Sequence, residues 1–263
     1  MYAFDFVKPS TLDEALSALA EDEAQAISGG QTLIPTLKQR LAMPSKLVSP
    51  TGIAELKGVK TEGNTLAIGG ATTHAVVAKE AAEAYPALAS LAGRIGDPSV
   101  RALGTIGGSL ANNDPSACYP AAALASGATI VTNTREIPAD DYFQGLFTTA
   151  LDEGEIVTGV KFPIPEKAHY QKFIQPASRF PLTAVFVAKY SSGVRVAVTG
   201  ASEDGVFRWS EGEEALGTNF SPDAVSGLSV DPDGMMADMH GTAEYRAHLV
   251  KVLTARAVAA ANG

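Results

Sequence analysis

Two pairs of adjacent glycines, each leading into a stretch with helical spacing, constrain the fold of this chain more than any other feature. Gly29-Gly30 follows the short apolar stretch "AQAIS", and Gly107-Gly108 lies in "GTIGGSLANN". Because glycine has no side chain, such turns let consecutive backbone N–H groups approach a phosphate or pyrophosphate closely. The spacing is equally compatible with a second interpretation, in which each pair only meets the positive φ of a tight turn. Neither pair belongs to a G-x-G-x-x-G motif or a P-loop.

The first half of the chain shows strand patterns alternating with helical ones. Thr11 and Glu14 form a capping-box pattern that predicts a helix over 11–21. "AQAIS" and "KLVSP" are predicted as short strands, with a helix between them that Thr32 caps and Pro44 ends. The next predicted elements are strands near 65–69 and 128–132 and helices near 73–79, 85–94 and 117–126.

The pattern changes after the predicted strand "EIVTGVKFPIP", where Pro163 and Pro165 mark a boundary. "LTAVFVAKY", "GVRVAVTGAS" and "GVFRWS" alternate like hairpin strands, with a turn at 191–193. Short helices are predicted in "SEGEEALGTN" and "SPDAVSGL", capped by Ser210 and Ser221. The last predicted element is a long helix in "TAEYRAHLVKVLTARAVAAA".

Charge and cysteine content argue against several classes of function. The net charge of −9, from 20 basic and 29 acidic residues, disfavours nucleic acid as a partner. We expect a cytoplasmic protein, because no apolar stretch would span a membrane and the first residues do not resemble a secretory signal. The single cysteine, Cys118, forms no intramolecular disulfide and is too few for an iron–sulfur cluster. The four histidines are scattered and predict no metal site.

The longer strings around the glycine pairs are more specific than the pairs themselves. "SGGQTLIPTLKQRL" and "GDPSVRALGTIGGSLANNDPSACYPAA" resemble the flavoprotein subunit of the molybdenum hydroxylases, a family that includes the medium subunit of aerobic carbon monoxide dehydrogenase and the flavin domain of xanthine dehydrogenase. The resemblance extends along the chain, through "FDFVKPSTLDEAL", "KFIQPASRFPLTAVFVAK" and "GTAEYRAHLVKVLTARAV".

The resemblance implies an α+β protein with a two-subdomain FAD-binding fold of the vanillyl-alcohol-oxidase type, followed by a C-terminal α+β domain of antiparallel sheet and helices. We expect the N-terminal FAD-binding subdomain over 1–55, the second FAD-binding subdomain over 56–165 and the C-terminal domain, of the CO dehydrogenase flavoprotein type, over 166–263.

The resemblance also implies which residues hold the FAD. The stretch 28–32 would bind the pyrophosphate through backbone N–H groups and the hydroxyl of Thr32, and the stretch 105–109 would hold the diphosphate and ribityl region from the other side. A side chain introduced at Gly30 or Gly107 is therefore expected to abolish FAD binding and leave the fold intact. The full set of expected cofactor-binding residues is Ile27, Ser28, Gly29, Gly30, Gln31, Thr32, Leu33, Ile95, Arg101, Thr105, Ile106, Gly107, Gly108, Ser109, Asn112, Asp114, Cys118, Val157 and Lys172.

Some of these residues have a structural interpretation as well. Many relatives carry an aspartate at the position of Cys118, and a small buried residue at a helix start is the alternative here. Lys172 competes with Gln175 for the position of a flavin-contacting lysine, and a solvated surface lysine is the alternative. His74, in a helical stretch, is expected to be a surface or packing residue.

The function implied is that of an oxidoreductase subunit without catalytic side chains or metal of its own, because flavin chemistry resides in the cofactor. A large subunit with a molybdenum–pterin cofactor and a small subunit with [2Fe–2S] clusters would be its partners, in a dimer of heterotrimers. Electrons would pass from the clusters to FAD and on to NAD, a quinone, a cytochrome or oxygen. The alternatives are a self-sufficient flavin oxidase or reductase of related fold and a subunit that has lost FAD.

Overall fold

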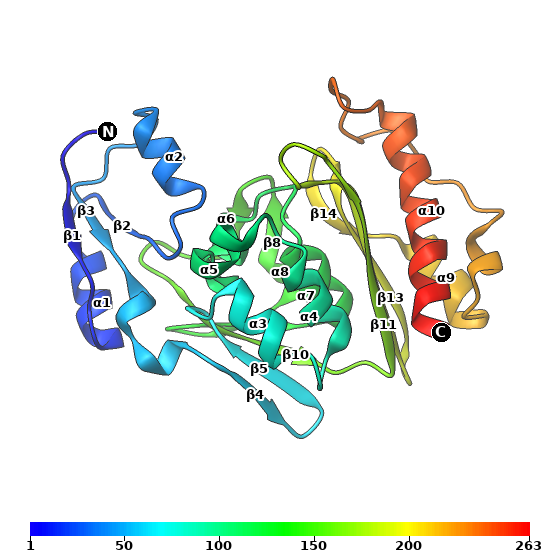
Figure 1. Cartoon of the computed structure of the whole chain (residues 1–263), viewed down its shortest axis with the longest axis horizontal. Helices are drawn as coiled ribbons and strands as arrows, with labels where there is room; N and C mark the ends of the chain where they lie inside the picture. Colours follow the sequence, from blue (N-terminus) through cyan, green and yellow to red (C-terminus); the bar gives the residue numbers. More distant parts are fainter.

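In the computed structural model, which describes residues 1–263, the chain forms three successive units, each built around its own β-sheet (Figure 1). The three sheets fall within the ranges 1–55, 56–165 and 166–263. The buried core does not stop at these limits, because Leu66 and Phe162 of the second unit share one cluster with Phe186 of the third. We therefore keep the three-part division as a proposal that follows the sheets.

The first unit is a parallel three-stranded sheet with strand order β1-β3-β2. Its elements are β1 (Asp5–Val7), α1 (Leu12–Leu19), β2 (Ala24–Ala26), α2 (Leu33–Lys38) and β3 (Lys46–Val48). The predicted helix over 11–21 is confirmed, and the Thr11 hydroxyl accepts a hydrogen bond from the N–H of Glu14. The two predicted strands on either side of α2 are confirmed as well.

Helix α2 is shorter than predicted. Thr32 stands at its N-cap position, but its side chain makes no capping hydrogen bond, so the predicted cap is wrong. The helix ends at Lys38, well before Pro44, since Arg40 adopts a left-handed φ of 61° that stops helical hydrogen bonding. The Thr32 hydroxyl is therefore not bonded to the backbone of the helix.

The second unit is an antiparallel five-stranded sheet, in the order β4-β5-β10-β6-β7, with a group of short helices beside it. Its strands are β4 (Val59–Glu62), β5 (Thr65–Gly69), β6 (Thr129–Thr132), β7 (Glu136–Pro138) and β10 (Val157–Pro163), and a separate pair is formed by β8 (Phe143–Gly145) and β9 (Thr148–Thr149). Its helices are α3 (His74–Glu80), α4 (Pro86–Gly93), α5 (Pro98–Leu103), α6 (Ile106–Asn112), α7 (Tyr119–Ser126) and α8 (Ala139–Tyr142). The strands and helices predicted between 65 and 132 are confirmed.

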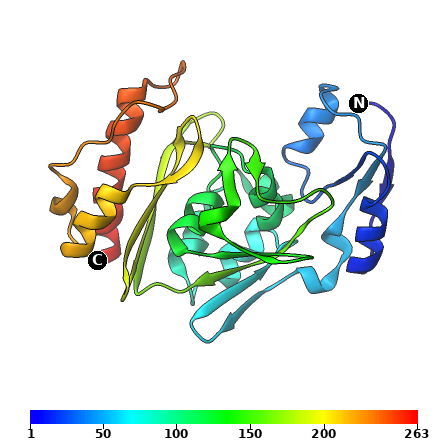
Figure 2. The same ribbon diagram turned by 180° about the vertical axis from the view of Figure 1, so that it is seen from behind.

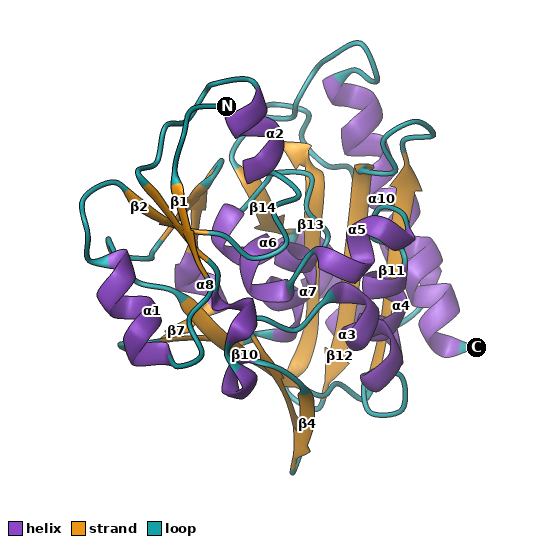
Figure 3. Cartoon of the chain, turned by 60° about the vertical axis from the view of Figure 1, so that its left-hand side comes forward, coloured by secondary structure: helices purple, strands orange, loops and turns teal.

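The third unit is an antiparallel sheet in the order β11-β12-β13-β14, which lies between two groups of helices (Figures 1 and 3). Its elements are β11 (Lys167–Ile174), β12 (Pro181–Tyr190), β13 (Gly193–Ser202), β14 (Gly205–Arg208), α9 (Ser210–Thr218) and α10 (Ala243–Asn262). The three predicted hairpin strands and the long last helix are confirmed, whereas β11 was not predicted. The predicted caps differ: Trp209 precedes α9, and Ser221 precedes a 3₁₀ turn without a side-chain bond.

Alternation along β12 explains why this sheet is covered on both faces. Ala184 and Phe186 point to the core shared with α4 and α7, and Val185 and Val187 point to the core shared with α9 and α10. Successive strand residues face opposite sides, so an unbroken run of apolar residues requires helices on both sides. The first unit and α10 consequently stand at opposite ends of the molecule, with the second unit between them (Figure 2). None of the helices combines the length and the apolar character that crossing a membrane requires.

Candidate functional site

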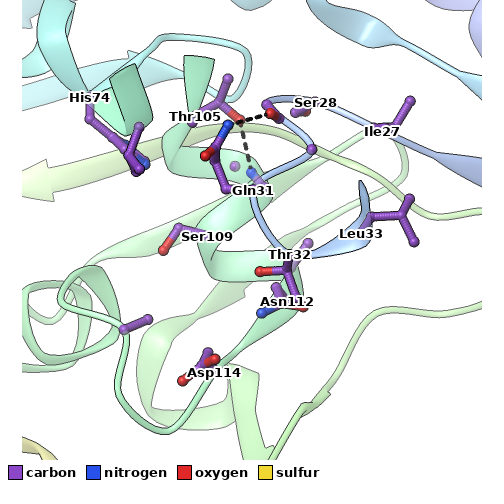
Figure 4. A pocket seen from close by; sticks show the side chains of 18 of the residues that line it. Ile27, Ser28, Gln31, Thr32, Leu33, His74, Thr105, Ser109, Asn112 and Asp114 are labelled. Atoms are coloured by element: carbon purple, nitrogen blue, oxygen red, sulfur yellow. Dashed lines mark hydrogen bonds between the residues drawn. The ribbon is translucent and has the colours of Figure 1, made fainter. Parts of the chain in front are cut away.

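A cavity of about 640 Å³ opens where the first unit meets the helices of the second, and it extends to β11 of the third. Its wall is formed mainly by residues 25–33 and by residues between 104 and 118, with further contributions from 155–157 and 178–180. Figure 4 shows the two main stretches facing one another. We call residues 28–33 the first glycine turn and residues 104–109 the second glycine turn.

The first glycine turn carries a row of backbone donors that the protein leaves free. The six N–H groups of residues 28–33 donate to no backbone or side-chain acceptor, whereas the N–H of Ile27 just before them bonds to the carbonyl of Val48. Gly30 adopts a φ of 66°, a conformation that favours glycine. Consecutive free amides in a turn form a concave binding surface for an anion. The turn thus offers a site for a phosphate or pyrophosphate.

The second glycine turn is different, because the protein uses its amides. The N–H groups of Ile106 and Gly107 donate to the carbonyls of Thr72 (3.1 Å) and Gly70 (2.9 Å). The N–H of Gly108 donates to the Thr105 hydroxyl at 3.1 Å, and the N–H of Ser109 donates to the Thr105 carbonyl at 3.0 Å. What this turn presents to the cavity is the Ser109 hydroxyl, which bonds to no other protein group.

Glycines allow the two turns to pack against other backbone segments. A Cβ on Gly29 would overlap the carbonyl oxygen of Leu103 and lie 2.5 Å from the Cα of Gly104. A Cβ on Gly107 would lie 2.6 Å from the carbonyl oxygen of Gly70. The expectation that a side chain at Gly107 would only block FAD is therefore wrong: it would first force two backbone segments apart.

The same correction applies to Gly30, for a different reason. A Cβ there would meet the flexible end of the Ile34 side chain, at 2.6 Å, and not an empty phosphate space. The positive φ of Gly30 strains any other residue in addition. A substitution at this position would alter the turn itself, so it does not test the phosphate site cleanly.

His74 lies behind the second turn. It was expected to be a surface or packing residue; the packing alternative is confirmed and the surface alternative is wrong, because the side chain is buried and reaches the cavity wall. A Cβ on Gly104 would lie 2.5 Å from its Nε2, and its ring centroid is 5.3 Å from that of Tyr119. Its Nδ1 is buried without a hydrogen-bond partner. Burial, assisted by the charge of Arg101, lowers the pKa of His74 to about 4, so the ring is neutral at pH 7.

The polar segment after α6 divides into cavity residues and a structural residue. Asn112 and Asp114 line the cavity, and the Asp114 carboxylate accepts a hydrogen bond from the N–H of Ser116. Asn113 takes the left-handed conformation that ends α6, and its side-chain amide donates to the carbonyls of Gly145 and Thr148, both at 2.8 Å. Asn113 therefore connects the segment to β8 and β9, whereas Asn112 and Asp114 line the cavity.

Cys118 and Lys172 meet on the cavity wall. The Lys172 ammonium donates to the carbonyl of Arg94 at 3.0 Å and to the Cys118 sulfur at 3.5 Å. Both side chains are buried, so the surface alternative for Lys172 is wrong and the expectation of a small buried residue at Cys118 is confirmed. Desolvation lowers the pKa of Lys172. Gln175, the competing position, lines a smaller neighbouring cavity instead.

Glu155 fixes the strand that borders the cavity beside Val157. Its carboxylate accepts hydrogen bonds from Thr132 (2.5 Å), Thr134 (2.6 Å) and Arg135 (3.0 and 3.1 Å). The Arg135 guanidinium and the two hydroxyls hold the pKa of Glu155 well below its usual range. Glu155 therefore acts as a charged anchor for the chain that enters β10.

Of the residues expected to bind the cofactor, those that line the cavity are Ile27, Ser28, Gly29, Gly30, Gln31, Thr32, Leu33, Ile95, Thr105, Gly107, Gly108, Ser109, Asn112, Asp114, Cys118, Val157 and Lys172. Arg101 and Ile106 do not line it. The Arg101 guanidinium instead donates to the carbonyls of Ile95 (2.9 Å) and Gly96 (3.2 Å), and Ile106 is fully buried in the core. Contact between any of these residues and FAD stays a prediction.

The wall also holds residues that were not expected to bind the cofactor, among them His74, Glu155, Arg179 and Phe180. Glu155 stands at the start of the quoted strand "EIVTGVKFP", so its position beside a cavity residue was the available signal. Arg179 and Phe180 belong to the turn between β11 and β12, and the failure to predict β11 concealed that turn. Arg179 adopts a left-handed φ of 62° and half of the Phe180 side chain is exposed.

Comparison with known proteins agrees with this geometry. A family described as the FAD-binding domain in molybdopterin dehydrogenase matches residues 2–165. The chain is 31% identical to the carbon monoxide dehydrogenase medium chain of Afipia carboxidovorans, over 97% of this chain and 96% of that one. It is 33% identical to the glyceraldehyde dehydrogenase medium chain of Sulfolobus acidocaldarius, with the same coverage of both chains.

Solved structures agree as well. A chain of the Cu,Mo-CO dehydrogenase in its cyanide-inactivated form superposes with a TM-score of 0.88 at 29% identity, over 98% of this chain and 97% of that one. A chain of quinoline 2-oxidoreductase from Pseudomonas putida 86 gives 0.88 at 27% identity, over 99% and 97%. The expected α+β architecture with a two-subdomain FAD-binding fold is thus confirmed, and so is the assignment of FAD. The chain belongs to the family of FAD-binding subunits of the molybdenum-containing dehydrogenases.

Proposed function

We propose that this chain is the electron-transfer subunit of a heteromeric molybdenum hydroxylase, carrying FAD between the [2Fe–2S] clusters of one partner and an external acceptor. The observation that carries the proposal is the row of six free amides at residues 28–33 on the wall of a large cavity. Such a row fits the pyrophosphate of a dinucleotide cofactor, because each unpaired N–H can donate to a phosphate oxygen.

The residues around the cavity fit the rest of FAD. The Thr32 and Ser109 hydroxyls and the Asn112 amide make no hydrogen bond within the protein, so they are available for phosphate, ribityl or ring atoms. Ile95 and Val157 provide apolar wall on which a flat ring can pack. When bound, FAD supplies a ring system that exchanges one or two electrons. The chain's own task is to bind that ring, orient it and set its electrostatic surroundings.

Partner subunits follow from what this chain lacks and from what its relatives are called. One cysteine does not provide the thiolates of a [2Fe–2S] cluster, so any cluster belongs to another chain. Several relatives are named medium chains or medium subunits, among them the nicotine 6-hydroxylase medium subunit of Paenarthrobacter nicotinovorans, at 32% identity over 99% of this chain and 98% of that one. We infer a large molybdenum–pterin subunit and a small iron–sulfur subunit, assembled as a dimer of heterotrimers.

The acceptor and the substrate are not specified by this chain. NAD, a quinone, a cytochrome and oxygen all remain compatible with the open cavity. The alternative, a self-sufficient flavin oxidase or reductase, requires a substrate site in this chain. The cavity residues include no nucleophile–histidine–acid arrangement that would mark one.

Two measurements test the proposal. The purified chain is expected to be yellow and to release FAD on denaturation, which absorbance and chromatography detect. Affinity purification of the tagged chain from its native host is expected to recover a large molybdenum-containing subunit and a small cysteine-rich one. A colourless chain that takes up no added FAD would refute the cofactor role, and a lone chain that turns over substrate would favour the alternative.

A further inference from the structure

Two cationic side chains cross one another where the C-terminal end of α4 meets β11: Arg94 follows α4, and Lys172 lies on β11 and lines the cavity. The Lys172 ammonium donates to the backbone carbonyl of Arg94 at 3.0 Å, and the Arg94 guanidinium donates to the backbone carbonyls of Tyr170 (3.1 Å) and Lys172 (3.5 Å). The Arg94 guanidinium also lies 5.6 Å from the centre of the Tyr170 ring. This reciprocal arrangement fixes the position of the Lys172 side chain on the wall.

Neither cation has a carboxylate partner. The ion pairs of the chain involve other lysines and arginines, and the only further partner of the Lys172 ammonium is the Cys118 sulfur. Lys172 is 7% exposed and Cys118 is 5% exposed. A buried ammonium bonded only to neutral groups is costly, so it is normally kept for an anionic or electron-rich partner.

The position of the cluster relative to the first glycine turn suggests what that partner is. The free amides of residues 28–33 lie on the side of α5 and α6 that faces the first unit, and β11 lies on the other side (Figure 1). Lys172, Cys118 and the free amides line the same cavity. A cofactor whose pyrophosphate occupies the amides can therefore extend one end toward Lys172.

We propose that Lys172 places an uncompensated positive charge against the electron-accepting ring of the bound FAD, and that Cys118 and the Arg94 carbonyl position this charge without neutralising it. The inference rests on the proposed function, because it requires that the chain binds FAD. A fixed positive charge stabilises the reduced, more electron-rich ring relative to the oxidised one, and so favours electron uptake. The thiol is essential to this arrangement, because a carboxylate at the same place would pair with Lys172 and cancel its charge.

The test compares two pairs of matched variants of the full chain, each loaded with FAD and equilibrated with a reference dye of known potential. Lys172→Met removes the charge, whereas Lys172→Arg retains it. Cys118→Asp introduces a neutralising carboxylate while Lys172 stays in place, whereas Cys118→Ser keeps a neutral acceptor of similar size. Flavin absorbance gives the ratio of reduced to oxidised FAD, and flavin fluorescence gives the affinity for FAD.

We expect Lys172→Met and Cys118→Asp each to lower the ratio of reduced to oxidised FAD at least ~10-fold at a given dye potential, which for a two-electron couple corresponds to about 30 mV. Lys172→Arg and Cys118→Ser are expected to stay within ~3-fold of the wild type, because both keep the charge uncompensated. A residue that only supported the fold would change stability or FAD affinity in these variants, but it would not separate Asp from Ser at position 118 in the electron equilibrium.

The outcomes separate this inference from the proposed function. A wild-type chain that takes up no FAD would overturn both. An FAD-loaded Cys118→Asp variant whose ratio equals that of Cys118→Ser would overturn this inference alone. If Lys172→Met does not fold, the Cys118 pair still decides, because both of its members retain Lys172.

Discussion

The two glycine turns look alike in sequence and differ in what their backbone does. In the first, residues 28–33 leave every amide free toward the cavity. In the second, the amides of residues 106–109 are all bonded to Gly70, Thr72 and Thr105. The first turn can therefore bind a ligand through its main-chain N–H groups. In the second turn these groups are used within the protein, so only its side chains can bind a ligand. A Gly-Gly pair before a helix does not by itself predict an anion site.

The glycines of both turns share one role, which is to let backbone segments pack closely against one another. Gly29 allows the first turn to lie against the backbone of Leu103 and Gly104, and Gly107 allows α6 to lie against Gly70. Gly70 in turn lies against the carbonyl of Val157, because a Cβ on it would overlap that oxygen. A continuous series of backbone contacts thus runs from the first turn, through the second turn and Gly70, to Val157 of β10. The shape of the cavity depends on this packing as much as on any cofactor contact.

The largest predicted effect concerns this packing. Gly107→Ala places a methyl group 2.6 Å from the Gly70 carbonyl oxygen, where neither backbone segment yields easily. We expect it to lower the free energy of unfolding by about 3 kcal/mol, the upper range for overpacking a core. Urea denaturation followed by circular dichroism measures the change.

Gly108→Ala provides the matched control within the same helix. Its Cβ would lie 3.1 Å from the Thr105 hydroxyl, which belongs to a side chain, and 3.4 Å from the Ser28 Cβ, which is an ordinary van der Waals contact. Alanine also favours a helix by about 1 kcal/mol over glycine, so the net change is expected to stay within about 1 kcal/mol. Equal losses in the two variants would contradict the distinction between backbone and side-chain contacts.

The second prediction concerns His74, which packs behind the second glycine turn. The pKa of His74 falls from 6.5 to about 4 on folding, so the unfolded chain binds a proton between these values while the folded chain does not. Protonation therefore favours unfolding as the pH drops below about 6.5, and the penalty reaches about 3 kcal/mol near pH 4, at 1.36 kcal/mol per pKa unit. The free energy of unfolding of the wild type and of His74→Gln, measured at pH 7 and pH 4.5, isolates this contribution.

The variant is expected to be less stable at pH 7, because it loses the packing of the imidazole against Gly104 and Tyr119. Its loss of stability on acidification should be smaller than that of the wild type by about 2 kcal/mol at pH 4.5. If both proteins lost the same free energy of unfolding on acidification, the proton responsible would bind at a residue other than His74.

Local patterns sufficed for most elements of the fold. Alternation predicted β12 and β13, and helical spacing predicted α1, α3 and α4, because these signals come from residues near one another in the chain. Which amides of the glycine turns are hydrogen-bonded within the protein was not predictable in this way. The partners of residues 106 and 107 lie at 72 and 70, and only the assembled fold brings them together. The same holds for Lys172 on the unpredicted β11, whose burial depends on its contacts with Arg94 and Cys118.

The smallest predicted effect separates main-chain from side-chain binding of FAD. Thr32 and Ser109 each carry a hydroxyl on the cavity wall that bonds to no protein group, so its removal leaves the fold intact. Since the second turn has no free amides at 106–109, Ser109→Ala is expected to weaken FAD binding ~10-fold, the value of one hydrogen bond of about 1.4 kcal/mol. Thr32→Val, beside the free amides of the first turn, is expected to weaken it by no more than ~3-fold, because the main chain retains the phosphate. Fluorescence titration of the apoprotein with FAD measures both. A larger loss for Thr32→Val than for Ser109→Ala would mean that the first turn binds through its side chains, and the contrast drawn between the two turns would then fail.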